Sequence, residues 1–223
     1  ILNAVHSKGN IYCQVGYNNN KACTAQEDPV YIAFPISEAN MEKWKETAQS
    51  GGTYTSDYNV NWAGATLGPK KIIGNLTVTG GGTLTITGPL WVTGNIDLSG
   101  GGLIKLATGY GVNDGVIIAD GIVSISGGGH ATGSGTEGSY IMLVSLSNST
   151  NAMSVSGGAG AVIVYAPNGT VSVSGGASLK EATGNKLSIT GGASITYESG
   201  LANNNFSSGP SGSWGIDSWK ETE

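Results

Sequence analysis

The sequence predicts an all-β fold: a right-handed parallel β-helix (a β-solenoid) of about six coils, with one N-terminal α-helix and a C-terminal wrapping tail. Three observations predict it. A five-residue phrase returns six times after residue 72. Short apolar runs bounded by Gly lie between its copies. Of the 223 residues, 38 are Gly and only 11% are charged, whereas 39% are hydrophobic, which is too large a share for a disordered chain.

The repeated phrase reads apolar-x-apolar-Ser/Thr-Gly. Its copies begin at Leu76, Ile96, Val123, Met153, Val171 and Leu187. Each copy fits a strand that ends at a tight turn, because Gly adopts positive φ without the penalty of a Cβ. Continuous apolar runs precede several copies, as at 116–119, 141–144 and 162–165. One repeat therefore holds up to three strands, and successive coils stack at about 4.8 Å around one core.

An antiparallel β-sandwich is the alternative fold, because Asn-Gly and Gly-Gly turns also close hairpins. Its turns would not carry the same phrase each time, so the parallel β-helix is favoured. The longer spacings between phrases predict insertions that bulge from the solenoid as loops. These insertions are 107–115, 130–139 and 145–151.

Three regions follow from the repeat and the charge distribution. Residues 1–71 are expected to form an N-terminal cap region, 72–200 the parallel β-helix, and 201–223 a C-terminal tail that packs on the solenoid. The cap region holds 12 of the 25 charged residues. In the tail, Trp214 and Trp219 are interpreted as packing anchors rather than sugar-stacking platforms.

One helix is predicted at about residues 38–49 of the cap region. Ser37 is a good N-cap, and Glu38 suits the positive end of the helix dipole. Met41 and Trp44 fall at helical spacing, and a Gly pair at 51–52 follows as a stop. We expect the apolar stripe to pack on the protein, with the helix region covering one end of the solenoid. A helix that docks a partner is the alternative.

The two cysteines, Cys13 and Cys23, are ten positions apart. A disulfide between them would close an Asn-rich loop and would favour an exported protein; two free thiols are the alternative. A metal site needs three or four ligands, and His6 is the only other soft ligand nearby, so no metal is expected. Because the chain opens with Ile1, we expect any signal or membrane anchor to lie upstream.

The composition also excludes some classes of binding partner. The chain has no Arg, and its 10 Lys stand against 15 acids, which argues against nucleic acid because such binders cluster Lys and Arg. No run of 18 apolar residues occurs, so no membrane span is predicted. The Gly-rich stretches lack the Lys-Ser/Thr ending of a phosphate loop, so no cofactor is expected.

Two outward ladders are predicted along the repeat. The first consists of Thr77, Asp97, Ser124, Ser154, Ser172 and Ser188. The second consists of Thr79, Ser99, Ser126, Ser156, Ser174 and Thr190. Together they form a flat surface, here called the hydroxyl face, with a single charge. One interpretation is a solvated sheet surface whose short hydroxyl side chains resist aggregation. The functional alternatives are carbohydrate contact, lateral packing against another subunit and ice binding.

The best catalytic constellation is Asp114, Asp120, His130 and Glu137, from two inserted loops on neighbouring coils. Both Asp residues precede Gly in turns, where an Asp side chain commonly bonds its own backbone. Glycoside hydrolysis needs two carboxylates about 5–9.5 Å apart, and the solenoid's acids include no close pair in sequence. We therefore predict no catalytic residue and keep these four as a candidate loop site.

Six segments carry a resemblance to a known family: Phe34-Pro-Ile-Ser37, Met41-Glu-Lys-Trp-Lys45, Leu67-Gly-Pro-Lys-Lys71-Ile-Ile-Gly-Asn-Leu-Thr-Val78, Val116-Ile-Ile-Ala-Asp-Gly121, Gly160-Ala-Val-Ile-Val-Tyr-Ala-Pro-Asn-Gly169 and Tyr197-Glu-Ser-Gly-Leu-Ala202. With them the chain resembles a family of uncharacterised bacterial surface β-helix domains of the minor-pilin-like type, found in candidate-phylum bacteria. The resemblance implies a surface-exposed β-solenoid behind an N-terminal membrane segment, with no established activity.

The favoured function is therefore a non-catalytic structural or adhesive one, in the exposed part of a bacterial appendage or anchored surface protein. The alternative is a β-helix that binds or cleaves carbohydrate through the loops at 107–139. A further alternative is a filament subunit that assembles through its ends. Expected partners are other copies of the chain or surface glycans, and a membrane only through an anchor upstream.

Overall fold

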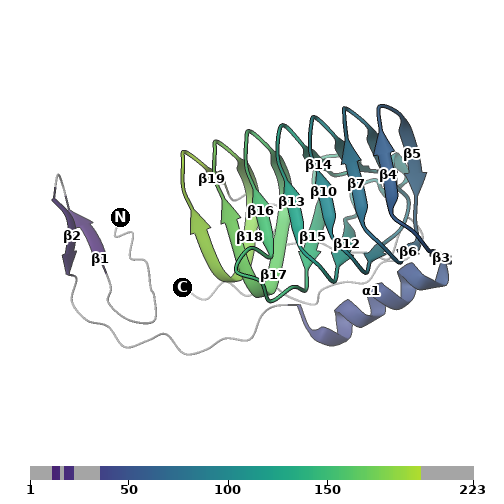
Figure 1. Cartoon of the computed structure of the whole chain (residues 1–223), viewed down its shortest axis with the longest axis horizontal. Coiled ribbons are helices and arrows are strands. Elements are labelled where there is room, and N and C mark those ends of the chain that lie inside the picture. The colour runs from purple at the N-terminus through teal and green to yellow at the C-terminus, as the bar shows by residue number, and fades with distance from the viewer. Residues whose placement is uncertain (1–11, 16–17, 23–35, 197–223) are drawn as a thin grey trace. The chain divides into compact units, whose positions relative to one another are not determined.

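The computed structural model describes residues 12–15, 18–22 and 36–196 (Figure 1). The chain divides into two units, Ile1–Pro35 and Ile36–Glu223. In the first unit, β1 (Tyr12–Val15) and β2 (Asn18–Ala22) pair antiparallel. Cys13 lies in β1, whereas Cys23 lies outside the described residues, so the disulfide stays a prediction.

The second unit is built from three columns of stacked strands, which join into one sheet (Figure 1). Every pairing within this sheet is parallel. Successive strands along the chain belong to successive columns, so that each passage through all three columns closes one coil. The predicted all-β parallel solenoid with one helix is confirmed.

The columns have the following members, with β17 (Gly160–Val173) and β18 (Ser178–Ile189) long enough to run through all three. The first column holds β3 (Thr53–Tyr54), β6 (Lys70–Ile72), β9 (Leu90–Val92), β12 (Gly115–Ala119) and β15 (Ile141–Ser145). The second holds β4 (Tyr58–Asn61), β7 (Leu76–Thr79), β10 (Ile96–Leu98), β13 (Val123–Ile125) and β16 (Met153–Val155). The third holds β5 (Gly64–Leu67), β8 (Thr83–Ile86), β11 (Leu103–Leu106), β14 (His130–Thr132) and β19 (Ser194–Ile195).

The repeated phrase forms the second column, and β7, β10, β13 and β16 each begin at its first residue. The two apolar positions of these strands point inward and are buried. At the corner that follows, both Gly residues adopt left-handed φ, as at Gly100 (+56°) and Gly101 (+73°). The Gly101 N–H donates to the carbonyl of Gly127 on the next coil at 3.0 Å. The phrase therefore specifies a strand, a corner and a link between coils.

The stacked strands begin before residue 72, within the region expected to be the cap. In β4, Tyr58 lies opposite Leu76, and Val60 lies opposite Val78. Residues 53–72 thus contribute β3 to β6 to the same sheet as the repeat. The phrase cannot be read there because Asn61 takes the place of its Ser/Thr and Trp62 the place of its Gly.

The helix α1 (Glu38–Ser50) matches the prediction and lies along the outside of the first column (Figure 1). The Ser37 side chain accepts the N–H of Asn40 at 3.2 Å, and Met41, Trp44 and Ala48 are buried. The helix covers a side of the solenoid rather than an end. Within the first column, β12 and β15 are buried on both faces, so the outer face of this column also needs cover.

Two of the predicted insertions contain regular structure. A short 3-10 helix, Thr108–Tyr110, lies within the predicted insertion at 107–115. The insertion predicted at 130–139 begins later, because His130–Thr132 forms β14 and pairs with β11. The predicted tail, 201–223, lies outside the described residues. Within the described part of the chain, α1 is too short and too polar to cross a membrane.

Candidate functional site

The two inserted loops of the candidate loop site lie against each other, and Asp114 helps to hold them together. Asp114 is only 1% exposed, and its carboxylate accepts the backbone N–H of Tyr140. The Ser139 hydroxyl donates to the carbonyl of Asn113 at 2.8 Å, and the Ser134 hydroxyl donates to the carbonyl of Gly111. The Asp114 carboxylate therefore joins the loops and is shielded from solvent.

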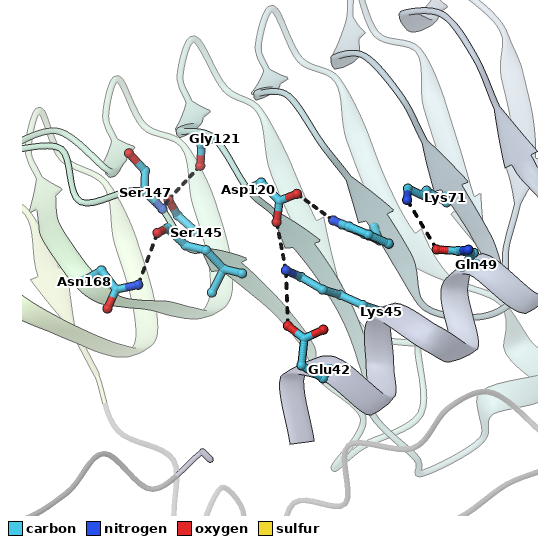
Figure 2. Close-up of polar contacts among 11 residues, drawn as sticks. Glu42, Lys45, Gln49, Lys71, Asp120, Gly121, Ser145, Ser147 and Asn168 are labelled. Atoms are coloured by element: carbon cyan, nitrogen blue, oxygen red, sulfur yellow. Dashed lines mark hydrogen bonds and ion pairs between the residues drawn. The ribbon is translucent and has the colours of Figure 1, made fainter. Parts of the chain in front are cut away.

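Asp120 lies at the end of β12, beside α1 (Figure 2). Its carboxylate accepts the indole N–H of Trp91 at 2.9 Å and lies 3.0 Å from the ammonium of Lys45. The Lys45 ammonium is also 3.6 Å from Glu42. The ammonium of Lys71 sits 3.7 Å from the centre of the Trp91 ring. Lys71 also donates to the side-chain carbonyl of Gln49 in α1 at 3.3 Å. We call Lys45, Lys71, Trp91 and Asp120 the helix clamp, since together they join α1 to the first column.

The separation of Asp114 and Asp120 excludes a shared carboxylate chemistry. The extended strand β12 runs between them, and six residues of strand at about 3.3 Å each span about 20 Å. Retaining or inverting glycoside hydrolysis needs carboxylates about 5–9.5 Å apart. These two residues of the candidate loop site therefore cannot act as an acid–base pair.

His130 and Glu137, the other two members, are both exposed. His130 belongs to the third column and pairs with Leu103 and Gly160. Its ring packs against Gly160, where a Cβ would come within 2.9 Å of the His130 Nδ1. Across the part of the chain that the structure describes, no three His, Cys, Asp or Glu residues gather in a way that could hold a metal ion.

The hydroxyl face is assembled in the predicted register. Each member of the first ladder lies opposite the next one, from Thr77 through Asp97 to Ser188. Asn59 of β4 extends this ladder by one level. In the second ladder, the Ser99 hydroxyl donates to the Thr79 hydroxyl at 3.4 Å. The face therefore offers hydroxyls and amides at regular intervals, with Asp97 as the one charge of the first ladder.

A second polar row, at the corner before the second column, was missed by the sequence analysis. The Asp57 carboxylate accepts the backbone N–H of Asn75 at 2.7 Å and its side-chain amide at 3.1 Å. The side-chain carbonyl of Asn75 accepts the N–H of Asn95 at 2.8 Å, and that of Asn95 accepts the N–H of Ile122 at 2.9 Å. The dipeptide Gly-Asn before two successive phrases, at 74–75 and 94–95, was the available signal.

Two side chains have shifted protonation equilibria. Burial raises the pKa of the Glu181 carboxyl above its ordinary value, and a hydrogen bond from Thr183 at 3.5 Å opposes this shift. Burial also raises the pKa of the Tyr110 phenol well above its usual range. The Tyr110 phenol therefore stays neutral at physiological pH.

No protein-family model, curated protein or solved structure matches the chain. Of the predicted site residues, the structure brings the members of the hydroxyl face together and separates Asp114 from Asp120.

Proposed function

We propose that the chain is a non-catalytic structural or adhesive protein of a bacterial cell surface, in which the solenoid is the exposed part of an appendage or anchored protein. The hydroxyl face carries the proposal. Its members pair in register from coil to coil, at a spacing of about 4.8 Å. Such a face is flat, stiff and nearly uncharged, which suits repeated contacts with a partner of similar regularity.

The use of the acidic side chains also supports the proposal. Asp114 joins two loops, and Asp120 pairs with Lys45 of α1 and accepts the indole N–H of Trp91. A carboxylate that acts in catalysis must reach substrate. The resemblance to minor-pilin-like surface domains supports the same location.

We infer about six coils from the six copies of the phrase, in addition to the coil that β3, β4 and β5 form before the first copy. The hand of the solenoid is right, because connections between parallel strands of one sheet are right-handed in about 98% of cases. A rod of this kind would hold its hydroxyl face away from the cell surface.

The proposal is tested with the full chain on insoluble cellulose, chitin and peptidoglycan, and by sedimentation velocity over a wide concentration range. We expect binding to one of these surfaces, or self-association, without release of reducing sugar. Ser154→Lys places a charge in the middle of the hydroxyl face and should abolish that contact. The matched control, Ser178→Lys, lies in the third column and should retain it. Release of sugar, or the absence of every contact, would refute the proposal.

One observation favours the filament alternative. Leu187 and Ile189 occupy inward positions of β18, which is the last strand of the second column among the described residues, yet they are 43% and 47% exposed. Val171 and Val173, one coil earlier at the same positions, are fully buried. A filament formed through this end predicts sedimentation that grows with concentration and reverts to monomer in Leu187→Lys, whereas Ser154→Lys has no effect on it.

A further inference from the structure

An exposed tryptophan stands at the first corner between the second and third columns. Trp62 and Ala63 connect β4 to β5. Because Asn61 pairs with Thr79, Trp62 takes the position that Gly80 holds one coil later. On the following coils the same position is held by Gly100, Gly127, Gly157, Gly175 and Gly191.

The backbone of Trp62 is strained. Its φ is +59°, and the glycines at the equivalent corners have φ between +53° and +65°. Trp62 is the only non-glycine residue with positive φ in the described part of the chain. A bulky side chain in this region is a genuine outlier, and such outliers cluster at ligand sites. Glycine would relieve the strain, so the corner itself does not account for the indole.

The indole is held in place yet remains open to solvent. A Cβ on Gly80 would come within 2.9 Å of Cε2 and 3.1 Å of Nε1 of Trp62, and within 2.3 Å of the Asn61 side-chain oxygen. The indole and the Asn61 amide therefore both rest against the bare Cα of Gly80. Trp62 is nevertheless 81% exposed, and its indole N–H has no hydrogen-bond partner among the described residues.

The neighbours of Trp62 define the chemistry of a ligand. Asn59 and Asn61 are exposed on the outer side of β4, and Thr77 and Thr79 lie beside them on the next coil. These side chains donate and accept hydrogen bonds without charge. A flat aromatic ring with an unused N–H, next to amides and hydroxyls, complements a ring with one C–H face and several hydroxyl groups.

We propose that Trp62 is the stacking residue of a binding site for a neutral pyranose sugar, with Asn59 and Asn61 as its hydrogen-bonding partners. The sugar belongs to a glycan chain whose neighbouring units lie along the hydroxyl face. This site gives the adhesive function a ligand class, and in that respect it rests on the function proposed above.

The test is titration calorimetry of the full chain with cellohexaose, chitohexaose and maltohexaose, three neutral pyranose oligomers. We expect one of them to bind, and Trp62→Gly to weaken that binding at least ten-fold. Trp62→Tyr keeps a flat ring and should retain part of the affinity. Val112→Gly is the matched control: Val112 is also an exposed apolar residue, at 64%, but lies in the 107–115 loop, and its loss should leave affinity unchanged.

Thermal unfolding separates a binding role from a structural one. Trp62→Gly restores the residue of every later corner, so its Tm should equal or exceed that of the original chain. A Tm lowered by several degrees would make Trp62 a structural residue and overturn the inference. It is also overturned if no oligomer binds, or if Trp62→Gly binds as well as the original chain. If Trp62→Gly binds as well as the original chain, the adhesive function stands and only the role of Trp62 is lost. Release of sugar from the oligomer would refute the adhesive function itself.

Discussion

Replacing Asp120 with Ala removes two contacts of the helix clamp at once. The Asp120 carboxylate accepts the Trp91 indole N–H at 2.9 Å and pairs with Lys45 at 3.0 Å. The pair with Lys45 joins α1 to the first column, whereas the hydrogen bond from Trp91 joins β9 to the end of β12 beneath that pair. The substitution therefore tests whether Asp120 acts as an anchor, as the structure indicates, or as a catalytic acid, as the candidate loop site suggested.

The expected loss follows from the two contacts. A hydrogen bond to a charged acceptor contributes about 1.5–3 kcal/mol. The side chain of Lys45 is 13% exposed and that of Asp120 is 35% exposed, so solvent screens the ion pair and limits it to about 0.2–1 kcal/mol. Asp120→Ala should thus lower the free energy of unfolding by about 2–4 kcal/mol. Asp120→Asn keeps a neutral acceptor for the indole and should lose only about 1–2 kcal/mol.

Urea unfolding followed by tryptophan fluorescence measures the change, since Trp44 and Trp91 both lie where α1 meets the solenoid. Hydrogen exchange of the α1 amides shows whether the helix detaches before the solenoid unfolds. Glu42→Ala is the matched control: Glu42 is 66% exposed, and its loss should change stability by less than about 0.5 kcal/mol.

The anchor role would be refuted if Asp120→Ala unfolded at the original urea concentration with unchanged protection of α1. If the same variant also lost turnover on a polysaccharide, the catalytic interpretation of Asp120 would replace it.

Two further predictions concern a corner and a half-buried acid. Gly101 has φ +73° and open space for a Cβ, so Gly101→Ala should lower the free energy of unfolding by about 1–2 kcal/mol through backbone strain alone. Gly102→Ala places a Cβ 2.4 Å from the Val78 carbonyl oxygen of the preceding coil and should lower it further. Urea unfolding measures both variants, and equal losses would contradict this packing. Because burial raises the pKa of Glu181, the folded chain binds that proton more tightly than the unfolded chain, and stability falls as pH rises through the folded pKa. Glu181→Gln should therefore be more stable than the original chain at pH 7, and this difference in stability should vanish below about pH 4. If the urea midpoints of the two proteins differed equally at both pH values, burial of the Glu181 carboxyl would not be the cause.

The elements that the sequence predicted well depend on local chemistry. The phrase beginning at Val123 encodes inward and outward positions by alternation and a corner by its glycines, so it forms the same structure wherever it occurs. The helix after Ser37 was predictable for a similar reason, because an N-cap and a stop act on neighbouring residues. The stacking of the hydroxyl face followed from the same periodicity.

What the sequence left undecided depends on which distant segments become neighbours. That Asp120 meets Lys45, 75 positions away, and not Asp114, six positions away, follows from the direction of β12 and the position of α1. The continuous apolar runs were a signal that the first column is covered on both sides, but only the packing shows that α1 supplies part of that cover. Likewise, Trp62 becomes recognisable as a corner residue only when Asn61 is paired with Thr79. Periodicity determines what each strand presents on its two faces, whereas register between coils determines which of those side chains meet.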